Sequence, residues 1–107
     1  MNNCFFIGKL IEDPQLCKVN NIDATFFKVA VEEYRKNKQG QKIKRVDTLD
    51  FEAWHTAAIT ITQNAKKHDM LAIEASARLN HDQGDCFVNF RINNFKIFDT
   101  DKYSNVE

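Results

Sequence analysis

Residues 47–79, DTLDFEAWHTAAITITQNAKKHDMLAIEASARL, decide the fold because their hydrophobic spacing changes twice. Over residues 47–54 apolar and polar side chains alternate, which predicts a strand with one buried face. From residue 56 to residue 67 apolar side chains recur at helical spacing, and a Lys-Lys-His run closes the segment in a way that suits a helix C-terminus. Residues 70–79 again have strand character. The stretch therefore predicts the order strand, helix, strand.

Two further strands are predicted before this stretch and at least one after it. The first is the apolar run CFFIGKL at residues 4–10, which an Asp-Pro turn at residues 13–14 follows. The second comes after an Asn-Asn turn and alternates over residues 24–34. Beyond a turn at residues 82–85, residues 86–98 form one long strand or two short ones.

The order of these elements predicts a mainly β protein. A five-stranded set with one short helix between strands 3 and 4 is the order of the OB-fold barrel. Strands 2 and 3 are joined by residues 35–45, RKNKQGQKIKR, which carry six positive charges and no acid. We expect this stretch to form the arm of a long hairpin. The prediction is one OB-fold domain over residues 1–98 and a short polar C-terminal tail over residues 99–107.

The composition argues against several classes of protein. The 107 residues include 15 Lys and Arg and 15 Asp and Glu, so the formal net charge is +0. No apolar run is long enough to cross a membrane, and the N-terminus lacks the pattern of a signal peptide, so a cytoplasmic protein is expected. The three cysteines lack a CxxC spacing and the three histidines are scattered. They predict no disulfide framework, no metal site and no cofactor.

The outer face of strands 2 and 3 carries the candidate binding residues. Strand parity places Trp54 opposite the predicted core residue Phe51, and Tyr34 lies on the outer side where the basic arm begins. Aromatic rings stack on unpaired bases, contributing roughly 1–3 kcal/mol per base, and nearby cations neutralise phosphates. The cations that bracket the two rings are Lys28, Arg35, Lys44 and Arg45. A solvated hairpin with incidental lysines is the alternative, which the charge pattern alone does not exclude.

Most of the other aromatic residues are expected to fill the barrel. The predicted core members are Phe5, Phe27, Phe51, Phe90 and Phe95.

Four segments resemble bacterial single-stranded DNA-binding proteins. NNCFFIGKLIEDPQL is similar to the family's first strand, with its hydrophobic run, Gly-x-Leu and Asp-Pro, and NNIDATFFKVAVEE resembles the second strand after an Asn-Gly turn. DTLDFEAWHTAAITITQNAKKHD resembles the third strand, the helix and a Lys-Lys-Gly turn, and MLAIEASARL resembles the fourth strand. The order and spacing of these segments carry the resemblance over residues 2–98.

The resemblance implies a sequence-tolerant single-stranded DNA-binding protein of DNA replication, recombination or repair, found in the cytoplasm at the nucleoid. By position, Trp54 matches the aromatic residue that closes the family's third strand and stacks on a base. Tyr34 or Arg35 falls near the aromatic residue that ends the second strand. The implied phosphate-contacting cations are Lys44, Arg45 and Arg78, followed by Lys28 and Lys9.

The sequence departs from the family pattern at several positions. Thr48 stands where many members have a second stacking aromatic residue. Asp50 and Glu52 place carboxylates on the face expected to meet phosphates, where they would repel them. The departures predict a weaker affinity for single-stranded DNA than that of a typical member, and its value is left open. The chain ends at Glu107 without the acidic tip that recruits partners in the family, and whether the natural chain has a longer tail is left open.

The expected partners are single-stranded DNA, from which single-stranded RNA is not distinguished, and further copies of the chain. The family assembles as dimers of dimers through its first strand, so CFFIGKL is the predicted pairing edge, with a homotetramer as the first expectation and a dimer as the second. The alternative function is that of an accessory protein similar to the primosomal OB-fold proteins, which acts through protein contacts. An enzyme that uses Asp47, Asp50 and Glu52 is disfavoured because no nucleophile or metal-ligand spacing accompanies them. A chromosomal, plasmid or phage role is left open.

Overall fold

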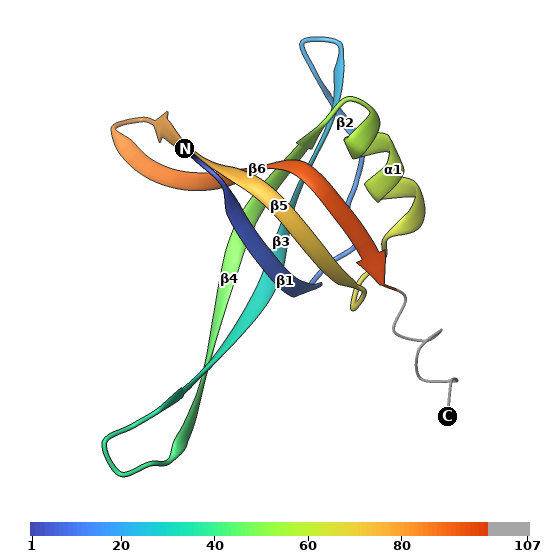
Figure 1. The fold of residues 1–107 in the computed structure, drawn as a ribbon. Helices are drawn as coiled ribbons and strands as arrows, with labels where there is room; N and C mark the ends of the chain where they lie inside the picture. The colour runs from blue at the N-terminus through green and yellow to red at the C-terminus, as the bar shows by residue number, and fades with distance from the viewer. Residues whose placement is uncertain (99–107) are drawn as a thin grey trace, which may run out of the picture.

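The computed structural model describes residues 1–98, which form a β-barrel with one helix and a long projecting hairpin (Figure 1). The predicted tail at residues 99–107 lies outside the described residues. In chain order the elements are β1 (Cys4–Leu10), β2 (Cys17–Val19), β3 (Ile22–Lys36), β4 (Lys42–Trp54), α1 (Thr56–Asn64), β5 (Met70–Asp82) and β6 (Asp85–Phe98). The predicted OB-fold order is confirmed, and the three-residue β2 is an addition that the sequence analysis missed.

Five of the described strands close into the barrel. β1 pairs with β3 on one side and with β5 on the other, and β6 lies between β5 and β4, which pairs with β3. The contact between β1 and β3 is short, since it consists of Lys9 opposite Ala30 and Leu10 opposite Val29. The contact between β4 and β6 is also short and is parallel. These two contacts convert an open sheet into a barrel.

The core lies inside the barrel and under α1. Phe27, Val29 and Phe51 are buried on β3 and β4, as their alternation predicted. Ala58 and Ile61 of α1 are fully buried and complete the same cluster. The predicted core residues Phe90 and Phe95 are partly buried and pack against this cluster.

The prediction that Phe5 is a core residue was wrong. Its side chain is 71% exposed, on the outer surface of β1. Phe6 faces the interior instead and meets the rings of Phe51 and Phe90 edge-on, with centroid distances of 5.5 and 4.8 Å. The unbroken apolar run CFFI has no alternation that would fix which of the two phenylalanines points inward.

The helix is shorter than predicted. It was expected to reach residue 67 but ends at Asn64. Ala65 N–H still donates to the Ile61 carbonyl at 2.9 Å, whereas the next two backbone N–H groups bond to carboxylates instead of to the helix. Lys66 N–H donates to Asp69 Oδ2 at 3.0 Å, and Lys67 N–H donates to Asp13 Oδ1 at 2.7 Å. Among the described residues no helix has the length and apolar character needed to cross a bilayer.

The predicted arm is confirmed as the extension of β3 and β4 beyond the barrel (Figure 1). Its pairing continues to Lys36 opposite Lys42. At the tip, Asn37 Oδ1 accepts hydrogen bonds from the N–H groups of Gln39 and Gln41 at 3.0 and 2.8 Å. The backbone N–H of Asn37 also donates to the Gln41 carbonyl at 2.9 Å, so the turn is closed by local residues.

Candidate nucleic-acid interface

The pairing of β3 with β4 divides the candidate residues of the arm between two faces. Residues directly opposite each other in an antiparallel pair share a face. Tyr34 lies opposite Lys44, and both have the parity of Trp54, which is that of the outer face. Arg35 and Arg45 have the other parity. Side chains of that parity point into the core within the barrel but are exposed on the arm. The structure therefore does not bring all the predicted arm cations to one surface.

The outer-face lysines are held by carboxylates of the neighbouring strand. Lys28 Nζ lies 2.6 Å from Asp50 Oδ1, and Lys44 Nζ lies 3.0 Å from Glu32 Oε1. The hydrogen bond to Asp50 raises the pKa of Lys28, and the hydrogen bond between Lys44 and Glu32 raises the pKa of the lysine and lowers that of the glutamate. Because these pairs are exposed they are weak, so a phosphate group can replace the carboxylate.

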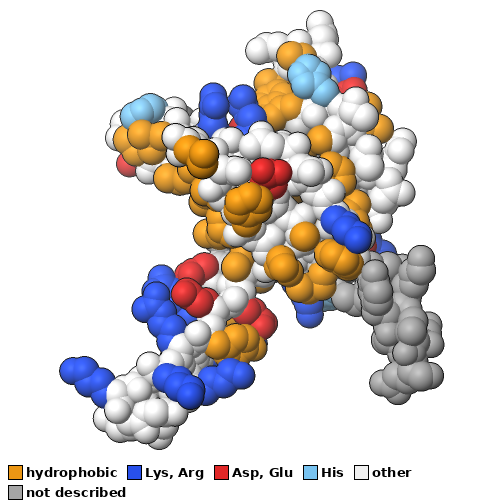
Figure 2. Space-filling view, viewed as in Figure 1, with side chains coloured by type: hydrophobic (Ala, Val, Ile, Leu, Met, Phe, Trp, Pro, Cys, Tyr) orange, Lys and Arg blue, Asp and Glu red, His pale blue; other side chains and the backbone are white. Residues whose placement is uncertain are grey.

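The arginines of the arm have similar partners. Arg45 Nε lies 3.1 Å from Asp47 Oδ2, and Arg35 Nε lies 3.6 Å from Glu33 Oε1. Figure 2 shows the resulting pattern, in which Lys and Arg side chains follow the arm and acidic side chains gather where the arm meets the barrel. The positive charge predicted for the arm is thus strongest toward the tip.

Tyr34 is exposed but already has two partners. Its hydroxyl donates to Glu32 Oε2 at 3.1 Å, and Lys42 Nζ lies 4.3 Å from the centroid of its ring. A cation over an aromatic face is attracted by the ring, which orders both side chains. The 51% exposure of Tyr34 leaves room for contact with a second flat group.

A cleft of about 310 Å³ opens beside the outer face, between the β3–β4 pair and β6. Phe26 of β3 and Phe87 of β6 line it and remain 46% and 44% exposed. Lys28 and Asp50 line the same cleft. The cleft therefore combines two accessible aromatic rings with a cation, its half-exposed counterion and a second carboxylate, that of Glu12.

The strand pairing places the remaining predicted cations, Arg78 and Lys9, beside residues of this cleft or of its face. Arg78 of β5 lies opposite Asn89 of β6, which lines the cleft, so the two side chains share a face. Lys9 of β1 lies opposite Ala30 of β3, whose parity is that of Lys28. Both Lys9 and Arg78 are exposed.

Trp54 is half-buried rather than open as predicted. The ring of Phe26 meets it edge-on with a centroid distance of 5.8 Å, and the Arg91 guanidinium lies over it at 5.6 Å. Its indole Nε1 is buried and makes no hydrogen bond within the described residues. Trp54 thus lies under two other side chains at the margin of the cleft.

The prediction that Glu52 presents a carboxylate to phosphates was wrong. Glu52 is only 5% exposed, and Arg91 Nε donates to its Oε1 at 2.7 Å. The pair forms because the parallel contact of β4 with β6 sets the two residues side by side. A buried carboxylate requires such a partner. Asp50, in contrast, has a half-exposed side chain, which is paired with Lys28.

The sequence analysis missed Phe87 and Arg91. Their signal is the alternation of Phe87, Asn89 and Arg91 with residues that include the buried Ile92, which assigns the first set to the outside. Within residues 1–98 no three His, Cys, Asp or Glu side chains come together as metal ligands. The arrangement offers flat rings and cations, which suits binding to a polyanion with exposed bases.

Comparison with known proteins agrees with the fold. Solved structures with the same fold include a deletion mutant of the single-stranded DNA binding protein from Thermus aquaticus, with a TM-score of 0.84 and 14% identity over 92% of this chain and 51% of that one. The small single-stranded DNA-binding protein from Streptomyces coelicolor has a TM-score of 0.74 and 12% identity over 95% and 97% of the two chains. A Plasmodium falciparum SSB in complex with ssDNA has a TM-score of 0.78 and 15% identity over 92% and 93%.

The chain thus spans about half the length of the Thermus aquaticus protein. No curated protein matches it. The family model described as the single-strand binding protein family matches residues 1–91, which include every predicted site residue. The resemblance inferred from the sequence is confirmed, and the chain belongs to the single-strand binding protein family.

Proposed function

We propose that this protein binds single-stranded DNA without strong sequence preference, by stacking unpaired bases on aromatic rings and neutralising phosphates with neighbouring cations. The observation that carries the proposal is the cleft in which Phe26 and Phe87 remain accessible beside Lys28. Family membership supports it, as does the similarity of the fold to an SSB that has been solved with ssDNA.

The chemistry of the cleft explains the expected tolerance of sequence. Every base has a flat face that can stack on Phe26 or Phe87, and every nucleotide has a phosphate for the lysines and arginines around them. The exposed ion pair of Lys28 with Asp50 can open as a phosphate approaches. No catalytic step is needed. Such a protein would protect exposed strands in replication, recombination or repair, in the cytoplasm at the nucleoid.

The test is titration of the protein with a fluorescently labelled oligo-dT across a salt series, with Trp54 emission followed in parallel. We expect saturable binding. The logarithm of the association constant should fall with the logarithm of the salt concentration, with a slope of roughly −0.7 per phosphate contacted. Quenching of Trp54, the only tryptophan of the chain, would place bases near the cleft. Absence of binding at low salt would contradict the proposal and favour the accessory role through protein contacts. An oligo-rU series compares RNA with DNA.

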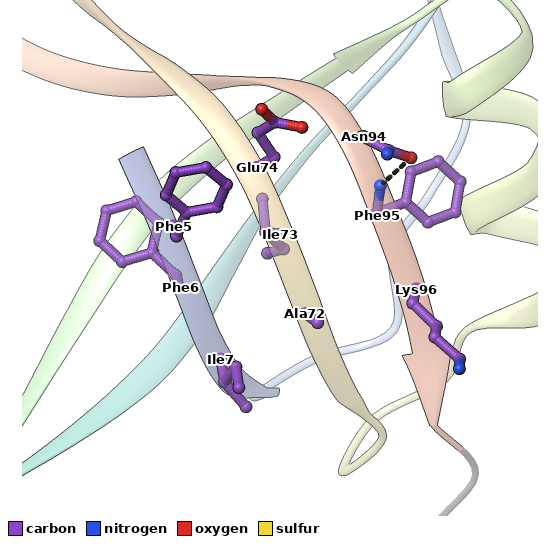
Figure 3. A pocket seen from close by; sticks show the side chains of 9 residues that line it. All are labelled: Phe5, Phe6, Ile7, Ala72, Ile73, Glu74, Asn94, Phe95 and Lys96. Atoms are coloured by element: carbon purple, nitrogen blue, oxygen red, sulfur yellow. Dashed lines mark hydrogen bonds between the residues drawn. The ribbon is translucent and has the colours of Figure 1, made fainter. Parts of the chain in front are cut away.

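We also propose that the chain assembles with copies of itself, as a tetramer or, second, as a dimer. The outer surface of β1, β5 and β6 has a hollow of about 500 Å³, whose lining is mainly apolar (Figure 3). Phe5 and Ile7 of β1 border it and are 71% and 65% exposed. Large apolar side chains exposed together indicate a protein contact surface.

Exchange of Phe5 for glutamate is expected to dissociate this assembly, because a charge would have to be buried at the contact. Multi-angle light scattering should give a multiple of the chain mass for the wild type and a smaller species for Phe5→Glu. Leu16→Glu is the matched control, since Leu16 is also exposed and lies outside this surface. A monomeric wild type would contradict the proposal.

A further inference from the structure

We propose that Arg91 binds a backbone phosphate of single-stranded DNA and that the buried Glu52 is the residue that positions it. The inference rests on the proposed function and adds a contact that neither the sequence pattern nor the family resemblance assigns. It starts from the arrangement of three side chains at the margin of the cleft, namely Glu52, Trp54 and Arg91.

Glu52 fixes one end of the Arg91 side chain. The Nε–H group donates to Glu52 Oε1 at 2.7 Å, and the carboxylate is 5% exposed. A buried acid of this kind keeps its partner, because separating them leaves an uncompensated charge in the protein. The arginine is therefore held in one orientation in the absence of nucleic acid.

The other end of Arg91 is available. A guanidinium has five N–H donors, and the Nε–H is the one used by Glu52; the donors on Nη1 and Nη2 make no hydrogen bond with the described residues. The side chain as a whole is 42% exposed. A planar fork with a fixed stem and free tips matches two oxygens of a phosphate group, in a geometry that a lysine cannot reproduce.

The surroundings place this fork beside the expected path of the strand. The guanidinium lies over Trp54, whose ring meets Phe26 of the cleft edge-on. On β6, Arg91 follows Phe87 and Asn89 at alternate positions, so all three side chains have the parity that faces the cleft. Bases stacked on the cleft phenylalanines would leave their phosphates toward such a margin, and a phosphate contact is the same for every base.

The main test compares Arg91→Lys with the wild type in binding to labelled oligo-dT and oligo-dC. Lysine keeps the charge and loses the fork, so we expect roughly 5-fold weaker binding to both oligonucleotides. Lys18→Ala is the control, because it removes a cation that is paired with Asp23 on the neighbouring strand and that lines neither the cleft nor the hollow of β1, β5 and β6. We expect it to leave the affinity unchanged.

A second set of variants separates positioning from charge. Glu52→Gln keeps an oxygen that can accept from Nε, whereas Glu52→Ala does not, and both remove the same negative charge. We expect Glu52→Gln to bind at least as tightly as the wild type and Glu52→Ala to bind about 3-fold more weakly than Glu52→Gln, with thermal unfolding confirming that both are folded. The double variant Glu52→Gln with Arg91→Ala leaves no unpaired buried charge. Relative to Glu52→Gln, its affinity should be about 10-fold lower. The slope of the logarithm of its association constant against the logarithm of salt should be shallower by roughly 0.7, which corresponds to one phosphate contact.

Each result bears on a different statement. Equal affinities for the wild type and Arg91→Lys, together with equal affinities and salt slopes for Glu52→Gln and the double variant, would overturn the inference and leave the proposed function standing. A loss confined to one oligonucleotide would overturn the phosphate assignment in favour of base recognition. Equal affinities for Glu52→Gln and Glu52→Ala would overturn the positioning role. A wild type that fails to bind either oligonucleotide would overturn the proposed function and this inference together.

Discussion

Gly8→Ala is expected to lower the free energy of unfolding by about 3 kcal/mol, a larger effect than alanine should have at either of the other two glycines. A Cβ atom at Gly8 would lie 2.5 Å from Val29 Cγ1 and 2.6 Å from the carbonyl oxygen of Ala30. Val29 is fully buried, so its side chain cannot turn aside, and the second neighbour is backbone. Relief therefore requires β1 to move away from β3 where their pairing closes the barrel.

Urea denaturation of the wild type and of Gly8→Ala measures this loss. Gly40→Ala is the matched control, because Gly40 at the arm tip has a φ of 79° but no atom within 4 Å of its would-be Cβ. It should cost only the backbone term of about 1 kcal/mol. A Gly8→Ala variant as stable as Gly40→Ala would contradict the close approach of β1 to β3.

The part of the fold that the sequence predicted is the part with a clear hydrophobic period. Phe27, Val29 and Phe51 alternate with polar residues, and each lies inside the barrel as expected. The N-terminal run has no such alternation, so the choice between Phe5 and Phe6 depends on pairing with β5, which no local pattern shows. The end of α1 likewise depends on distant groups, since Asp13 binds an N–H group 54 residues away.

The candidate site likewise contains residues that a local pattern could place and residues that only a distant contact places. Tyr34 and the arm lysines could be placed because parity along one strand defines a face. The pair of Glu52 and Arg91 joins residues 39 positions apart through the contact of β4 with β6. Because that contact depends on closure of the barrel, single-strand parity gave Glu52 an open position that Arg91 in fact covers.

Simultaneous exchange of Phe26 and Phe87 for alanine is expected to weaken binding of oligo-dT by about 30-fold or more. Stacking contributes at least about 1 kcal/mol for each ring, and a total of about 2 kcal/mol corresponds to that factor. The rings line one cleft and are 46% and 44% exposed, so they are accessible to bases and their removal should cost little stability.

Binding of the two single variants and the double variant, at one salt concentration, forms a cycle that measures whether the rings act together. If the losses of binding free energy in the two single variants add up to more than the loss in the double variant, one strand must engage both rings at once. Val88→Ala is the matched control, because Val88 is 48% exposed and lies next to Phe87 with the opposite parity. Unchanged affinity of the double variant would show that bases do not enter the cleft. In that case the phosphate contacts of the arm and of Arg91 would be the whole source of the affinity. Binding should then be almost abolished at high salt, because no stacking energy would remain.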